Sequence, residues 1–197
     1  GLGGSATSDC GIGMLKAMGD DWKKIRKDCS FVLASDVTNP LCGPNGAAHV
    51  FAPQKGADAK MVEILDARAR KFAEVSKKHF EKEQDDARSS QDMIVDASKM
   101  PGAGAAGGLG YAFLQYFHAE FHSGADLLLD AVDFEHLVAD AELVITGEGH
   151  SDKQTLMGKM PQKILERAKN ANANLPVWLI SGGISDKEAL LDAGFDK

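Results

Sequence analysis

The sequence lacks the features that mark several large classes of protein. No apolar run approaches the length that crosses a membrane, and no secretory signal peptide is visible. The net charge is −7 and the basic residues do not cluster, which argues against a nucleic-acid partner. The cysteines, Cys10, Cys29 and Cys42, are odd in number and match no zinc-binding spacing, so we expect free thiols and a cytoplasmic location.

Several catalytic signatures are also missing. No G-x-S-x-G element is present, and His118 and His122 stand at the i, i+4 spacing of zinc proteases without the glutamate after the first histidine. Lys159 follows Gly158, but Met160 replaces the Ser or Thr of a Walker A motif. These absences argue against hydrolase, zinc-protease and P-loop mechanisms.

The patterns that are present predict an α/β protein. The 197 residues, 44% of them hydrophobic, suffice for one large α/β domain or parts of two. Apolar runs predict strands at 31–34, 93–95, 143–145 and 177–180, the last two covered on both faces. A charged loop is expected at 81–92. One expected helix begins at Asp58 and has Met61, Ile64, Leu65, Phe72 and Val75 on one face, which we expect to be buried. A second helix contains Leu109, Phe113, Phe117 and Phe121. A third runs from Pro161 to about Asn170, and a fourth lies between a Ser185–Glu188 capping box and Gly194.

Two long loops follow predicted strands. Residues 36–56 show no helical or strand period, and residues 147–160 separate a strand from a helix, where roughly two to six residues are usual. Open α/β sheets bind ligands at the carboxyl ends of their strands. We therefore expect these loops and a glycine-rich segment at 102–110 to form one site.

The glycine-rich segment 102–110 has five glycines in nine positions. No strand immediately precedes its G-x-G-x-x-G pattern, so a Rossmann dinucleotide site is not expected. Two alternatives remain. The free N–H groups at the start of the following helix bind an anion with help from Lys99, or the glycines allow tight packing against another backbone.

The first nine residues form a second cluster, which contains Gly3, Gly4, Ser5, Thr7, Ser8 and Asp9. Its hydroxyl groups can donate hydrogen bonds to phosphate oxygens. The Asp9 carboxylate cannot donate, so it faces a cation or a substrate hydroxyl, or it merely caps the following helix.

Charged side chains stand in both long loops. Asp36 follows the 31–34 strand, where it suits magnesium ligation or proton acceptance from an alcohol, or is an ordinary loop carboxylate. Lys55 lies in a short turn that aims it at a phosphate or carboxylate, unless it is a plain surface lysine. Glu148 and Asp152 place two carboxylates beyond a buried strand.

Phosphate-binding loops with acids at strand ends are typical of phosphoryl transfer, which depends on positioning and charge neutralisation. Five stretches, in this order, resemble the type-I glycerate kinase family: GLGGSATSD at 1–9, SDVTNPL at 35–41, PQKGA at 53–57, GAGAAGG at 102–108 and VITGEG at 144–149. The resemblance implies that ATP, with Mg²⁺, phosphorylates a hydroxyl of D-glycerate. It also implies two α/β domains flanking a cleft: residues 1–136, with the glycine-rich loops, and residues 137–197, part of a flavodoxin-like parallel-sheet domain.

With this resemblance, our hypothesis gives catalytic roles to Lys55, Asp36 and Asp152. Lys55 holds a phosphate or carboxylate, and Asp36 or Asp152 binds magnesium or accepts the proton of the attacking hydroxyl. The residues expected to bind substrate or nucleotide are Gly3, Gly4, Ser5, Thr7, Ser8, Asp9, Thr38, Asn39, Gln54, Gly102, Gly104, Gly107, Gly108 and Glu148.

The chain also departs from the family pattern. The segments that the family carries before Gly1 and after Lys197 are absent, and His150 stands where an arginine is common. We therefore expect this chain to be cut from something longer and to have little activity alone. Two alternatives stay open, namely a non-catalytic module that binds nucleotide or phosphate, and a kinase of another small hydroxy acid.

Overall fold

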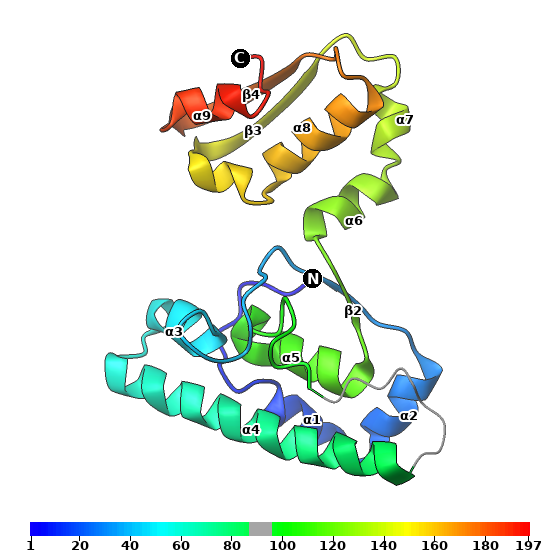
Figure 1. Cartoon of the computed structure of the whole chain (residues 1–197), viewed down its shortest axis with the longest axis vertical. Helices are drawn as coiled ribbons and strands as arrows, with labels where there is room; N and C mark the ends of the chain where they lie inside the picture. The colour runs from blue at the N-terminus through cyan, green and yellow to red at the C-terminus, as the bar shows by residue number, and fades with distance from the viewer. Residues whose placement is uncertain (87–95) are drawn as a thin grey trace. The chain divides into compact units, whose positions relative to one another are not determined.

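The computed structural model describes residues 1–86 and 96–197, in two compact units, Gly1–His122 and Ser123–Lys197 (Figure 1). It is a mixed α/β structure with parallel strands, as predicted. The expected boundary at 136/137 lies inside helix α7 (Phe134–Val138), in the second of these units, and the division into two domains there stays a prediction. The assignment of the C-terminal residues to a flavodoxin-like domain stays a prediction.

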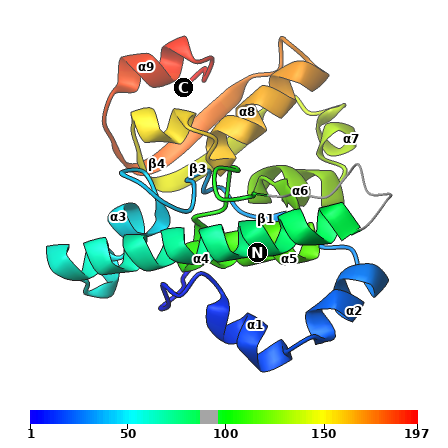
Figure 2. The same ribbon diagram turned by 60° about the horizontal axis from the view of Figure 1, so that its bottom comes forward.

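The N-terminal unit is mainly helical around a short parallel strand pair. Strand β1 (Val32–Ala34) pairs with β2 (Glu120–His122), with Leu33 opposite Phe121. The helices are α1 (Ile12–Met18), α2 (Asp21–Asp28), α3 (Ala47–Phe51), the 3₁₀ helix η1 (Pro53–Lys55), α4 (Ala59–Asp86) and α5 (Ala105–Phe117). Figure 2 shows the long α4 running beside α5.

Helix α4 begins where the sequence indicated. The Asp58 carboxylate accepts a hydrogen bond from the Met61 backbone N–H at 2.7 Å, an N-terminal cap. The predicted buried face is partly wrong, because the Met61 and Val75 side chains are 44% and 59% exposed. The buried residues instead are Val62, Asp66, Ala69, Ala73, Ser76 and Phe80, spaced alternately four and three apart. Small alanines on this stripe let the backbone of α4 approach its neighbours closely.

Three further expectations for this unit need correction. The 36–56 loop contains α3 and η1, and α4 continues through residues 81–86, where we expected a loop. The predicted apolar helix ends at Phe117, because His118 adopts left-handed backbone angles (φ 50°), and Phe121 lies in the unpredicted strand β2. The strand predicted at 93–95 lies outside the described residues.

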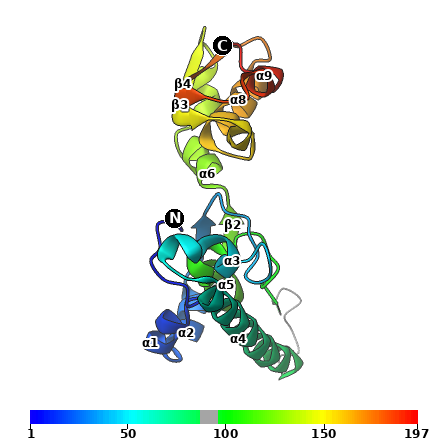
Figure 3. The same cartoon turned by 90° about the vertical axis from the view of Figure 1, so that its left-hand side faces the viewer.

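The C-terminal unit is a two-stranded parallel sheet with helices. Strand β3 (Val144–Ser151) pairs with β4 (Val177–Ile184), with Val144 opposite Val177. The remaining elements are α6 (Gly124–Ala131), α7, the 3₁₀ helix η2 (Lys153–Leu156), α8 (Met160–Ala171) and α9 (Lys187–Asp192). Pro161 stands in the first turn of α8, as predicted, and Figure 3 shows α8 on one side of the strands.

The strands of this unit differ from our expectation in two ways. They are longer, since β3 runs through Ser151, so the predicted loop at 147–160 shrinks to η2 and a short turn. Burial alternates along each strand, and Ile145, Trp178 and Ile180 face away from the core. The sheet is therefore packed on one face, not both. The predicted Ser185–Glu188 capping box is also wrong, because the residue before α9 is Asp186 and makes no side-chain cap bond.

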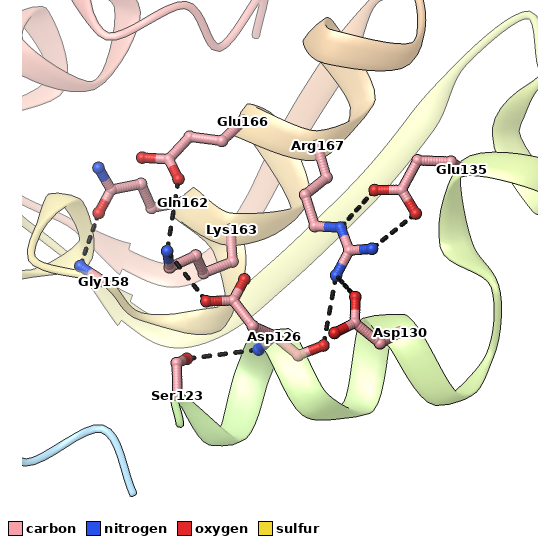
Figure 4. Close-up of polar contacts among 9 residues, drawn as sticks. All are labelled: Ser123, Asp126, Asp130, Glu135, Gly158, Gln162, Lys163, Glu166 and Arg167. Atoms are coloured by element: carbon pink, nitrogen blue, oxygen red, sulfur yellow. Dashed lines mark hydrogen bonds and ion pairs between the residues drawn. The ribbon is translucent and has the colours of Figure 1, made fainter. Parts of the chain in front are cut away.

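Arg167 on α8 ties α6 and α7 into this unit (Figure 4). Its guanidinium donates to both carboxylate oxygens of Glu135 at 2.5 and 2.6 Å and pairs with Asp130 at 2.6 Å. Nearby, Lys163 pairs with Asp126 at 3.2 Å. These contacts explain why α6 and α7 group with α8.

Among the helices that the structure describes, none is both long enough and apolar enough to cross a membrane.

Candidate functional site

A small pocket in the N-terminal unit gathers several of the predicted binding residues. Its volume is about 170 Å³, and four segments contribute to it: the N-terminal loop, the loop after β1, α3 with η1, and the start of α5. The lining residues are Leu2, Gly3, Gly4, Ser5, Val37, Phe51, Gln54, Lys55, Ala106 and Gly107. Sequence reasoning missed Leu2, Val37, Phe51 and Ala106, which carry no chemical signal of their own.

Lys55 is the cation of this pocket. Its Nζ donates to Ser5 Oγ at 2.8 Å and to the Thr7 carbonyl oxygen at 2.6 Å. Pro53 opens the turn that carries the lysine, and Gly56 closes it with φ 93°. The side chain is thus held by groups about fifty residues away in sequence, unlike a freely moving surface lysine.

The surroundings of Lys55 suit an anion. Both oxygens that hold its ammonium group are neutral, and no carboxylate among residues 1–86 and 96–197 forms an ion pair with it. An ammonium group has three N–H donors, and these two contacts leave one for a ligand. Burial lowers the pKa of Lys55, because removal from water disfavours the charged form.

The glycines of the 102–110 segment serve close packing. A Cβ on Gly107 would lie 2.0 Å from the Thr7 carbonyl oxygen, and one on Gly104 would lie 2.4 Å from the Pro40 carbonyl oxygen. Two of the predicted anion-binding amides are already engaged: the N–H of Gly104 donates to Asn39 O, and that of Gly108 donates to Gly104 O. These contacts support the packing alternative at both positions, and the binding role of Gly104 and Gly108 stays a prediction.

The same segment places backbone at the pocket. Ala106, Gly107 and Gly108 have φ values of 53°, 68° and 87°, so the regular turns of α5 begin only after them. Positive φ is uncommon for a residue with a Cβ, and Ala106 is such a case. Gly102, the fourth predicted glycine, is buried, and a Cβ there would meet the Phe121 ring.

Other predicted residues of this unit are used by the fold or exposed. The Asp9 carboxylate accepts from the N–H groups of Gly11 and Gly13 at 3.1 and 2.9 Å, just before and within the first turn of α1, whose N-cap residue is Gly11. Its binding role stays a prediction. Asn39 donates from Nδ2 to Asn45 O. Asp36 and Thr38 are exposed on either side of Val37, which lines the pocket, and Ser8 is half-buried.

The predicted acids Glu148 and Asp152 lie in the C-terminal unit. The Asp152 carboxylate accepts from the Gln154 N–H at 2.7 Å, and Thr155 Oγ1 accepts from the Asp152 N–H at 3.0 Å. This is a capping box for η2, so the Ser151–Gln154 box considered from the sequence is wrong.

Glu148 has a different environment. Its Oε1 accepts from Thr155 Oγ1 at 2.5 Å and from Ser151 Oγ at 3.1 Å, while Lys159 Nζ lies 3.8 Å from Oε2. Ser151 Oγ also makes a short hydrogen bond with Ser181 Oγ. Sequence reasoning gave no role to these three hydroxyls. Ser151 and Thr155 reach Glu148 through the turn into η2, and Ser181 comes from β4.

Two observations bear on metals and thiols. Within residues 1–86 and 96–197, no group of three or more His, Cys, Asp and Glu side chains is arranged to hold a metal ion. The three cysteines have free thiols, as predicted. Burial raises the pKa of Cys10 to about 12 and that of Cys42 to about 11, so both thiols stay protonated near neutral pH.

Comparison with known proteins identifies the family. The model of the glycerate kinase family matches residues 20–197. A glycerate kinase of Bacillus subtilis is 39% identical over 100% of this chain and 54% of its own length, and a glycerate 2-kinase of Escherichia coli is 37% identical over 94% and 52%. The crystal structure of a putative glycerate kinase 2 from Salmonella typhimurium LT2 superimposes with a TM-score of 0.71 at 33% identity, over 98% of this chain and 59% of that one. The chain spans about half the length of the curated relatives it matches, and it belongs to the glycerate kinase family.

Proposed function

We propose that the protein transfers the γ-phosphoryl group of ATP to a hydroxyl of D-glycerate. The single observation that carries this proposal, together with family membership, is the Lys55 ammonium group held at a glycine-lined pocket by Ser5 and Thr7. Phosphoryl transfer needs positive charge placed before the reaction begins, and a fixed lysine supplies it.

Lys55 binds an anionic group in this proposal, either a phosphate of ATP or the glycerate carboxylate. The pocket accepts a small group, since its volume is about 170 Å³, and the exposed backbone at Gly3 and Gly4 adds no bulk. Gln54, beside Lys55, contributes an amide that can donate to an oxygen. Thr7, Ser8, Thr38 and Asn39 orient the substrates from the adjoining loops.

Asp36 is the proposed magnesium ligand of the N-terminal unit. Mg²⁺ is commonly held by one or two carboxylates together with substrate phosphates and water, so one exposed aspartate fits this role. When bound, the ion would neutralise charge on the phosphate oxygens. Asp36 stands beside the pocket residue Val37, and Ser35 Oγ accepts from the Val37 N–H at 3.2 Å, which fixes the turn that carries it.

The acids of the C-terminal unit keep their predicted roles as proposals. Asp152 binds magnesium or accepts the hydroxyl proton through the carboxylate oxygen that does not cap η2, and Glu148 binds substrate or nucleotide.

The test compares Lys55→Met with Lys60→Met, which removes an exposed lysine at the start of α4. Calorimetry with ATP and with D-glycerate measures binding, and coupled ADP release measures turnover. We expect Lys55→Met to weaken binding of one substrate by roughly tenfold or more, since hydrogen bonds to charged groups contribute about 1.5–3 kcal/mol. Lys60→Met should behave as wild type.

The outcomes separate this proposal from its rivals. Binding of ATP without turnover of any hydroxy acid would identify a binding module. Faster turnover of another hydroxy acid than of D-glycerate would identify a different kinase. Equal binding by both lysine variants would remove Lys55 from the site.

A further inference from the structure

A cluster of polar side chains surrounds Glu148 within the paired strands β3 and β4. Ser151 and Thr155 are completely buried, yet both hydroxyls donate to the Glu148 carboxylate. The Glu148 side chain itself is 19% exposed. A half-buried carboxylate is thus fixed by two hydroxyls that have no access to water.

The two carboxylate oxygens differ in what surrounds them. Oε1 accepts both hydroxyl hydrogen bonds, at 2.5 and 3.1 Å. Oε2 has the Lys159 ammonium group at 3.8 Å, which attracts its charge but is too long for a hydrogen bond. Among the residues that the structure describes, Oε2 is therefore the oxygen left to accept a hydrogen bond from a ligand.

The backbone around Glu148 also holds it in place. A Cβ on Gly147 would lie 2.4 Å from the Ile180 carbonyl oxygen, so the strands approach closely just before the glutamate. Glu148 pairs with Ser181 in the strand register, and Ser181 in turn contacts Ser151. The position of the carboxylate is set by strand pairing and by three hydroxyls together.

We propose that Glu148 Oε2 accepts a hydrogen bond from a hydroxyl group of a bound substrate, and that Thr155 and Ser151 are positioning residues that aim it. This inference rests on the proposed function. The recognised chemistry is a hydroxyl donor, which either glycerate or the ribose of the nucleotide supplies. Hydrogen bonds to a charged acceptor are stronger than those between neutral groups.

The location supports this assignment. Ligands of open parallel sheets bind near the carboxyl ends of the strands, and Glu148 lies in the second half of β3, three residues before its end at Ser151. Each acid of this region has one carboxylate oxygen engaged, Asp152 by the Gln154 N–H and Glu148 by two hydroxyls. The two buried hydroxyls fix the Glu148 carboxylate from side chains whose replacement tests its role as the hydroxyl acceptor.

Four variants of the protein test the proposal: Glu148→Gln, Ser151→Ala, Thr155→Val and Thr155→Ser. Steady-state kinetics give kcat and the KM for each substrate, and calorimetry gives binding of D-glycerate and of ATP. We expect Glu148→Gln to raise the KM of one substrate by roughly tenfold or more, with the other KM nearly unchanged. Ser151→Ala and Thr155→Val should raise the same KM. Thr155→Ser keeps the hydroxyl donor, so its KM should stay close to that of wild type.

Two comparisons distinguish positioning from simple destabilisation. Thr155→Val also removes the acceptor of the Asp152 N–H, whereas Ser151→Ala leaves that cap intact. Thr146→Val makes the same chemical change at a buried threonine of β3 whose hydroxyl is not one of the two that donate to Glu148, so it should leave both KM values unchanged.

The source of the hydroxyl follows from the substrate affected. If the KM for ATP changes, nucleotides that lack the 2′- or 3′-hydroxyl should bind wild type more weakly than ATP does. These nucleotides should bind wild type and Glu148→Gln with the same affinity. If the KM for glycerate changes, these nucleotides should bind both proteins alike.

The proposal fails if Glu148→Gln and Thr155→Val match wild type in both KM values and in both binding constants. If wild type binds the substrates but does not turn over glycerate, the proposed function fails. The binding constants of wild type and Glu148→Gln from calorimetry then still test the role of Glu148. If wild type binds neither substrate, both proposals are overturned.

Discussion

Replacing Gly107 by alanine tests why the 102–110 segment contains so much glycine. The added Cβ would lie 2.0 Å from the Thr7 carbonyl oxygen and 2.8 Å from the Thr7 carbonyl carbon, distances that no relaxed side chain adopts. The backbone of Gly107 also has φ 68°, which L-residues disfavour. Both effects oppose the substitution, so one of the two segments must move.

The expected loss of stability is large for one methyl group. Left-handed backbone costs roughly 1–2 kcal/mol, and overpacking costs about 1–3 kcal/mol, so together they amount to about 2–5 kcal/mol. Native domains are stable by only about 5–15 kcal/mol. Because the Thr7 carbonyl also accepts from Lys55 Nζ at 2.6 Å, the displacement should weaken anion binding as well.

Urea unfolding followed by tryptophan fluorescence measures the effect. Trp22 lies in the N-terminal unit and Trp178 in the C-terminal unit, so a Trp178→Phe background reports the N-terminal unit alone. Gly3→Ala is the matched control, because its Cβ would meet no atom within 4 Å. We expect this control to change the free energy of unfolding by less than about 1 kcal/mol.

A Gly107→Ala protein as stable as the Gly3→Ala control would refute the reasoning. It would mean that the segment does not pack on Thr7 and that its glycines have another purpose. Loss of stability in both variants would instead show that any added side chain in these loops is harmful.

Two further predictions concern charged groups. Arg167→Met should lower the free energy of unfolding of the C-terminal unit by about 1–2 kcal/mol, because Glu135 and Asp130 are 45% and 64% exposed and their pairing is weakened by solvent; Trp178 fluorescence measures this, and a loss that does not shrink at high salt would contradict an electrostatic origin. Binding of phosphate or ATP should weaken as pH rises through the lowered pKa of Lys55, since only the protonated amine attracts an anion. Calorimetry across alkaline pH should show that binding by wild type begins to decline below the pH range in which an ordinary lysine loses its proton. If the same decline persists in Lys55→Met, another group causes it.

The sequence alone determined the features that depend on neighbouring residues. Asp58 and Pro161 mark helix starts because capping and the fixed φ of proline act within one turn. The apolar run at 31–34 predicted β1 for a similarly local reason. The order of short motifs along the chain was sufficient to indicate the family.

The tertiary structure decided which residues are buried and where strands end. Met61 and Val75 are apolar but exposed, while Ala69 and Ser76 are buried, because burial depends on which face of α4 packs against the rest of the unit and not on side-chain polarity alone. Strand β3 continues through Glu148 because β4 supplies hydrogen bonds to a segment whose own composition does not favour a strand.

The candidate site shows the same division. The sequence identified Lys55 and Glu148 as chemically able residues, but only the fold brings Ser5 and Thr7 to the lysine and Thr155 to the glutamate. The glycines of 102–110 were visible from the start, yet their purpose depends on a carbonyl group about one hundred residues earlier in the chain. Such close approaches are set by the folded backbone, and no local pattern records them.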